Sequence, residues 1–193
     1  PVSVINAGQS VTEGRSALAQ QLSAGVGALH YFGHGSPVAW SSQGSLWGVG
    51  DSTTVQNQSG QAVVFSWSCF SEWYQYLYGP SLMESLILAP NSGVSAAVGP
   101  SGITLPAQQS VLREPLYQYY FVQKLPLGEA VRRAKADAVR QSTDALDVVT
   151  GWNLLGDPSM QNDVGRLLST PKSLNELQLD LTQSKKAVRA TAP

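Results

Sequence analysis

The stretch "GALHYFGHGSPVAW" (27–40) holds both histidines of the chain and governs how the fold is interpreted. Its first part belongs to a short apolar run, residues 26–33, typical of a strand buried on both faces of a sheet. Glycines then stand on both sides of His34, and they allow the backbone to turn sharply where the strand ends. The stretch therefore predicts a buried strand that delivers His34 to the rim of a sheet.

The rest of the chain predicts an α/β fold, a three-layer sandwich with a mostly parallel sheet. Apolar runs at 61–67 ("QAVVFSW") and 92–99 ("SGVSAAVG") predict two more buried strands, and we expect short strands at 2–6 and within 148–160. Helical spacing predicts helices over 12–25, 81–89, 105–123 and 127–141, with the third bent or split at Pro115. Residues 34–60 are rich in Gly, Ser, Gln and Trp and are predicted to form a long loop. Buried strands that alternate with helices favour a sheet covered on both faces.

The segment 127–141 is the clearest helix. Its arginines and lysine are expected on one face, and the apolar face is predicted to carry Ala130, Val131, Ala134, Ala138 and Val139.

Composition limits the classes of function. The chain has 193 residues, 42% of them hydrophobic, which suits one globular domain with a substantial core. The formal net charge is −1 and no lysine or arginine stripe is present, so we expect no nucleic-acid partner. No apolar run is long enough to predict a membrane span. Only 13% of residues are charged, a surface more common in secreted proteins, and we expect secretion or cell-surface exposure. The start at Pro1 suggests a processed piece, and the polar residues 167–193 are expected to be a tail or linker.

Cys69, the single cysteine, follows the predicted strand 61–67 and so falls at the same rim as His34. In such sheets ligands bind beyond the carboxyl ends of the strands. If the two strands are neighbours, a thiol and an imidazole face each other, which is the minimum for nucleophilic acyl transfer. The N–H groups of Gly35 and Cys69 are candidates for an oxyanion hole. Taken alone, a cysteine at a strand end is also compatible with buried packing, and a histidine beside glycines with a plain loop residue.

His30 is interpreted as a packed strand residue whose ring N–H finds a carbonyl. Four residues along a strand separate His30 and His34 by about 13 Å, so this pair does not predict zinc binding, and we expect no metal.

Loop residues near the rim are further candidates for substrate binding. Trp40, Trp47 and Trp73 are expected either to line a peptide-binding cleft or to anchor long loops. Glu72 and Asp51 are expected either to contact a basic substrate side chain or to be solvated loop carboxylates.

Several segments in a fixed order carry a resemblance to a known family. They are "HYFGHGS" (30–36), "VVFSWSC" (63–69), "SLMESLILAPNSGVSAAVG" (81–99), "LGEAVRRAK" (127–135) and "WNLLGDPSM" (152–160). Over about residues 16–160 the chain resembles the gingipain-type cysteine peptidases, relatives of caspases and legumain. The resemblance implies a caspase-like fold and a dyad of His34 and Cys69 that hydrolyses peptide bonds of a protein or peptide substrate without metal or cofactor. It also implies export from a bacterial cell. The family's domain is longer on its N-terminal side, so residues 1–166 are expected to be its C-terminal part, with an N-terminal subdomain missing.

One difference from the family leaves other functions open. Members tend to have a glycine shortly after the nucleophile, whereas Phe70, Ser71 and Glu72 follow Cys69 here. One alternative is a CHAT-type caspase-like peptidase that works inside a defence or signalling assembly. The other is a catalytically inactive caspase-like domain used for binding.

Overall fold

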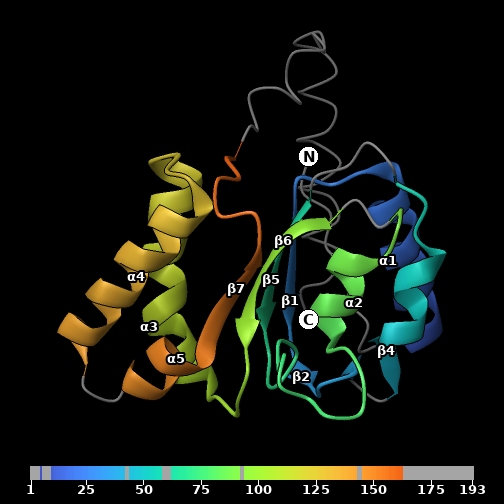
Figure 1. The fold of residues 1–193 in the computed structure, drawn as a ribbon, viewed down its shortest axis with the longest axis horizontal. Coiled ribbons are helices and arrows are strands. Elements are labelled where there is room, and N and C mark those ends of the chain that lie inside the picture. Colours follow the sequence, from blue (N-terminus) through green and yellow to red (C-terminus); the bar gives the residue numbers. More distant parts are fainter. Residues whose placement is uncertain are drawn as a thin grey trace, which may run out of the picture. The chain divides into compact units, whose positions relative to one another are not determined.

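A four-stranded sheet organises the chain (Figure 1). The computed structural model describes residues 5, 10–41, 44–57, 62–91, 94–142 and 145–162, and residues 5–162 form one compact unit. The strand order is β1-β5-β6-β7, where the strands are β1 (Ala28–Phe32), β5 (Ala62–Trp67), β6 (Val94–Pro100) and β7 (Trp152–Gly156). β1, β5 and β6 run parallel, and β7 is antiparallel to β6. The predicted mostly parallel sheet is confirmed.

Helices cover both faces of this sheet, as Figure 1 shows. α1 (Val11–Ala24) and α2 (Leu82–Leu88) pack on one face, and α3 (Pro106–Tyr117), α4 (Leu127–Gln141) and α5 (Leu146–Gly151) pack on the other. Every residue of β5 is buried, and its side chains feed two separate cores: Val64 joins the α1/α2 core, and Val63 and Phe65 join the α3/α4 core. A strand buried on both faces is apolar at most positions, which is why the run 61–67 does not alternate between apolar and polar residues; the polar Ser66 is buried and hydrogen-bonded.

Local sequence sets the helix ends. α2 begins with a capping box in which the Ser81 hydroxyl accepts from Glu84 N at 3.4 Å and Ser81 N donates to Glu84 Oε2 at 2.7 Å. α3 continues through Pro115 to Tyr117, and the break expected at the proline comes instead as a π-helical turn, η2 (Gln118–Val122).

α4 has the predicted bounds, and two of its side chains differ from expectation. Four of the five residues predicted for its apolar face are buried, namely Ala130, Val131, Ala134 and Ala138, and Leu127 at the start of the helix is buried as well. Val139 was placed on the apolar face wrongly, because its side chain is 47% exposed. Lys135 does not join the charged face, because its ammonium donates to the carbonyl of Trp152 where β7 begins.

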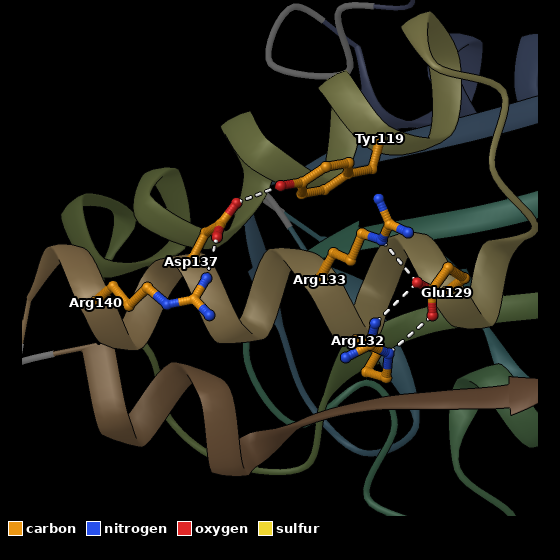
Figure 2. A network of polar contacts seen from close by, with 6 residues as sticks. All are labelled: Tyr119, Glu129, Arg132, Arg133, Asp137 and Arg140. Carbon is orange, nitrogen blue, oxygen red and sulfur yellow. Dashed lines mark hydrogen bonds and ion pairs between the residues drawn. The ribbon is translucent and has the colours of Figure 1, made fainter.

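The outer face of α4 carries paired charges, shown in Figure 2. Glu129 accepts from Arg132 and Arg133 at 2.6–2.8 Å, and these two guanidinium groups lower the pKa of Glu129 to about 2. Asp137 accepts from Arg140 at 2.9 Å and from the Tyr119 hydroxyl at 2.5 Å. Each carboxylate is thus matched locally, as expected for a solvent-facing helix.

The prediction of a long loop over 34–60 was wrong. The segment contains three short antiparallel strands, β2 (His34–Gly35), β3 (Ala39–Ser41) and β4 (Ser45–Gly48), followed by a 3₁₀ helix, η1 (Val49–Thr54). Trp40 of β3 pairs with Trp47 of β4, both side chains are buried, and Tyr31 stacks on Trp40 at 4.5 Å between ring centroids. These large aromatic side chains supply the apolar area that holds such short strands.

Other predictions meet the structure in part. Residues 146–151 are the helix α5 and only 152–156 form a strand, so the strand predicted within 148–160 begins later than expected. The strand predicted at 2–6 falls outside the described residues except for Ile5, and the tail 167–193 lies wholly outside them. Within the described ranges, no helix is long and apolar enough to cross a bilayer.

Candidate active site

The register between β1 and β5 brings the two predicted catalytic residues to one rim. Phe32 pairs with Trp67, and both strands end there. His34 and Cys69 each follow two residues later, at the carboxyl end of the parallel strands, where β2 lies in Figure 1. His34 is exposed and Cys69 is half-buried, so both are open to a ligand.

The two glycines beside His34 are explained by close approach. A Cβ at Gly33 would lie 2.6 Å from the Tyr31 hydroxyl, which crosses the glycine to donate to the His34 carbonyl at 2.7 Å. A Cβ at Gly35 would lie 2.7 Å from the Cys69 carbonyl oxygen and 2.7 Å from Ser68 Oγ. At Gly35 the close atom is backbone, so only a residue without a Cβ fits, whereas a Cβ at Gly33 would displace the Tyr31 hydroxyl from the His34 carbonyl. Gly35 therefore sets the backbone next to His34 directly against the backbone of Cys69.

Residues far along the chain fix the position of Cys69. The Ser68 carbonyl accepts from Thr104 Oγ1 at 2.9 Å and from Gln109 Nε2 at 3.3 Å. The Cys69 thiol donates to the Thr104 carbonyl at 3.6 Å. Thr104 lies two residues before α3, and Gln109 lies in its first turn. Neither was identified from the sequence, because no local pattern links them to residues more than thirty positions away.

A ring of three buried serine hydroxyls lies beneath the site. Ser66 and Ser68 are 2.9 Å apart, Ser68 donates to Ser71 at 3.2 Å, and Ser71 donates to Ser66 at 2.8 Å. The Trp40 indole N–H donates to Ser66 at 2.9 Å. Since Trp40 is fully buried in this network, the prediction that it lines a peptide cleft is not supported and it acts as an anchor.

Glu72 is also buried, which removes it from the substrate-facing residues. Burial raises the pKa of its carboxyl well above the ordinary value, and the backbone amides of Gly99 and Leu155 oppose this. Neither carboxyl oxygen makes a hydrogen bond of normal geometry with the described residues. Burial at this position therefore favours the neutral carboxyl over the carboxylate. Asp51 likewise faces no open cleft: it accepts from Gly48 N at 2.8 Å and pairs with Arg15.

Trp73 lies near the rim, as expected from the sequence. It is half-buried, and its ring lies 5.4 Å from that of Phe70, the residue after Cys69. Phe70 itself has a φ of 56°, in the left-handed region that favours glycine.

His30 is packed, as predicted, although its partner is not a carbonyl. Its ring stacks on Phe65 at 4.9 Å, and burial lowers its pKa to about 4. The Trp67 indole donates to the Tyr117 hydroxyl at 2.9 Å, and that hydroxyl lies 2.6 Å from His30 Nδ1. The Tyr117 hydroxyl thus links the Trp67 indole to the His30 ring, and the tautomer of the imidazole sets which of Tyr117 and His30 donates in the second hydrogen bond. No group of three or more His, Cys, Asp or Glu side chains suited to a metal ion occurs in the described part of the chain.

Comparison with known proteins extends this description. The structure is similar to a crystal structure of the Arg-specific cysteine proteinase gingipain R (RgpB), with 18% identity and a TM-score of 0.68 over 76% of this chain. It is also similar to a complex of the pro- and mature domains of Porphyromonas gingivalis RgpB, with 18% identity and a TM-score of 0.64 over 75% of this chain. A third match, described as a protease, has 16% identity and a TM-score of 0.65 over 74% of this chain.

The extent of these matches matters for function. This chain spans 36% of the length of each of the three solved chains. No curated protein matches it. The family model for peptidase family C25 matches residues 2–162, which is most of the chain. Together with a caspase-like α/β fold of the same kind as gingipain R, this match means that the chain belongs to peptidase family C25, the gingipain family.

Proposed function

We propose that this protein is a cysteine endopeptidase in which Cys69 is the nucleophile and His34 transfers the proton. The observation that carries the proposal is the approach of Gly35 to Ser68 and Cys69, which leaves no room for a Cβ. Because His34 precedes Gly35 directly, its side chain starts from the backbone that touches the Cys69 loop. Membership of peptidase family C25 supports the same chemistry.

The reaction follows from the chemistry of the two side chains. His34 accepts the proton of the Cys69 thiol, which must first leave the Thr104 carbonyl. The thiolate attacks the peptide carbonyl, and His34 returns the proton to the departing amine as the C–N bond breaks. Water, deprotonated by His34, then attacks the thioester, releases the acid product and restores the thiol.

The N–H groups of Gly35 and Cys69 are proposed to stabilise the oxyanion. Ser36 N donates to the Ala39 carbonyl at 2.9 Å, so Ser36 and Ala39 form a hydrogen-bonded pair of the β2–β3 ladder. Because such pairs alternate along antiparallel strands, the neighbouring pair Gly35–Trp40 is the non-bonded kind. The Gly35 N–H therefore faces away from β3, and we propose that it donates a hydrogen bond to the developing oxyanion. We keep export from the cell as part of the proposal, since the low share of charged residues fits an exported protein.

The first test measures how fast Cys69 reacts with iodoacetamide between pH 5 and 9. If His34 stabilises the thiolate, the midpoint of the rate profile moves to higher pH in His34→Ala. His30→Phe is the matched control, because it removes the other histidine and keeps the ring stacked on Phe65. An unchanged midpoint in His34→Ala would mean that no dyad forms.

Cleavage of a denatured protein substrate is the second measurement. Cys69→Ala should abolish cleavage, and Gly35→Ala should lower kcat/KM by about 10²-fold or more, because the added Cβ displaces the oxyanion donor. Gly50→Ala is the control for the second substitution, since no atom lies within 4 Å of a Cβ there. Cleavage that persists in Cys69→Ala would remove the nucleophile from the proposal, and the inactive binding domain would replace it.

A further inference from the structure

The loop that leaves Cys69 carries a row of aromatic side chains. Ring centroids are 5.4 Å apart between Phe70 and Trp73, 5.6 Å between Trp73 and Tyr76, and 5.5 Å between Tyr76 and Tyr78. We call these four residues the aromatic row. It begins at the residue bonded to the proposed nucleophile and extends away from it, so it lies beside the place where a scissile bond would sit.

The surface around the aromatic row is exposed and uncharged. Tyr78 is 87% exposed, Leu77 is 90% exposed and Tyr74 is 50% exposed. The single charged residue between positions 69 and 80 is Glu72, and its side chain is buried. Large apolar side chains gathered at one place on a surface mark a binding site more often than single ones do.

Backbone hydrogen bonds hold this loop against the sheet. Phe70 N donates to the Gly102 carbonyl at 3.0 Å and Glu72 N donates to the Pro100 carbonyl at 3.0 Å. Met83 N donates to the Ser71 carbonyl at 3.1 Å, which ties the loop to α2. Since the backbone is already ordered, a ligand that covers the rings does not have to order it, and rigid aromatic side chains lose little conformational entropy on binding.

We infer that the aromatic row is a subsite that binds aromatic or aliphatic side chains of an extended peptide substrate, next to the bond to be cleaved. The inference rests on the proposed peptidase function. A permanent occupant, such as a second copy of this chain, would cover the rim that holds Cys69 as well as the row, whereas a substrate covers both only during turnover. The absence of exposed charge in the loop favours apolar side chains of the substrate over acidic or basic ones.

The test is a binding measurement in the full chain carrying Cys69→Ala, which cannot turn the peptide over. One fluorescein-labelled decapeptide has Phe and Leu at alternate positions between Gly and Gln, and a second has Ser in place of each Phe and Leu. Fluorescence anisotropy gives the Kd of both. The row variant combines Tyr78→Ser, at the exposed end of the aromatic row, with Leu77→Ser at its exposed neighbour, and neither substitution disturbs the core. The control variant is Val122→Ser, which is 65% exposed on the opposite face of the sheet.

The Phe/Leu peptide should bind at least about 10-fold more tightly than the Ser peptide, and the row variant should remove this preference while Val122→Ser keeps it. Equal binding of the two peptides, or a preference that survives in the row variant, would overturn the inference. Light scattering gives the oligomeric state of each variant. The inference would also be overturned if the main effect of the row variant were a change in oligomeric state, because the row would then contact a second copy of the chain. Binding is measured without turnover, so the two proposals are tested separately. If the Phe/Leu peptide binds through the row but the wild-type chain cleaves no substrate, the proposed function is refuted and the inference about the row stands.

Discussion

At the residue scale, the backbone next to Cys69 is held in a conformation that its side chain does not favour. Phe70 has a φ of 56°, where any residue with a Cβ meets steric crowding that glycine avoids. Phe70 thus keeps a backbone conformation that glycine adopts without strain. The ring is retained in the aromatic row, which fits a role for Phe70 that glycine could not fill.

This strain makes Phe70→Gly more stable than Phe70→Ala, by about 1 kcal/mol in the free energy of unfolding. Both substitutions remove the ring, so the difference between their free energies of unfolding reports the effect of the backbone conformation at position 70. At ordinary positions the order is reversed, because glycine adds conformational entropy to the unfolded chain. Urea unfolding of the two variants measures the difference, and Lys124, with a φ of 59° away from the rim, should show the same order. If alanine proved the more stable replacement at both positions, the strain would be absent.

Sequence reasoning placed His34 and Cys69 at one rim because both follow the ends of apolar runs, but it left the role of Trp40 open and expected Glu72 at the surface, where it does not lie. The pattern around these two residues contains glycine and serine, as loops do, and nothing local shows that the side chains turn inward. The buried indole N–H of Trp40 is satisfied by a hydrogen bond to Ser66, which is 26 positions away in the sequence. Such contacts depend on the folded sheet and cannot be seen in a short window of sequence.

At the scale of elements, α4 depends on small residues. Ala130, Ala134 and Ala138 are fully buried, and they allow the helix to lie close to the core that it shares with α3 and the sheet. Ala134→Leu should lower the free energy of unfolding by about 1–3 kcal/mol, because a close-packed interior has no space for three more carbons. Ala136→Leu on the half-buried side of the same helix is the control, and thermal or urea unfolding measures both. A similar loss in both variants would mean that helix propensity, and not packing, is responsible.

The elements that could be predicted are those long enough to show a period. α4 spans 15 residues and was predicted with its bounds, and β5 was predicted from a continuous apolar run. β2, β3 and β4 have two to four residues each, too few for any alternation to appear, and they were predicted as loop. What holds them is the burial of Trp40 and Trp47, which is tertiary. α5 was missed because "VVTGW" has the β-branched residues of a strand, while packing against α3 and α4 favours a helix.

At the scale of the whole molecule, the two faces of the sheet each hold a titratable side chain whose pKa is shifted by burial toward the neutral form. His30 packs on the α3 face, and burial lowers its pKa from 6.5 to about 4. Glu72 is buried next to Gly99 of β6, and burial raises the pKa of its carboxyl well above 4.5.

The two shifts have opposite consequences for stability. Between pH 4 and 6.5 the unfolded chain binds a proton at His30 that the folded chain does not, so the free energy of unfolding falls as pH falls. Above pH 4.5 the folded chain keeps a proton on Glu72 that the unfolded chain loses, so the free energy of unfolding falls as pH rises.

These opposing effects overlap between about pH 4.5 and 6.5, and single substitutions should separate them. In Glu72→Gln only the effect of His30 remains, and the free energy of unfolding should increase by about 1–2 kcal/mol from pH 5 to pH 6.5. In His30→Phe only the effect of Glu72 remains, and it should decrease over the same range. The wild-type slope should lie between those of the two variants, because each group offsets the other.

Glu129 and Asp157 have lowered pKa values and change the free energy of unfolding at more acidic pH, so they contribute little between pH 5 and 6.5. Urea unfolding at pH 5.0, 5.5, 6.0 and 6.5 gives the three slopes. Equal slopes in all three proteins would mean that burial does not shift the pKa of either side chain in the folded state.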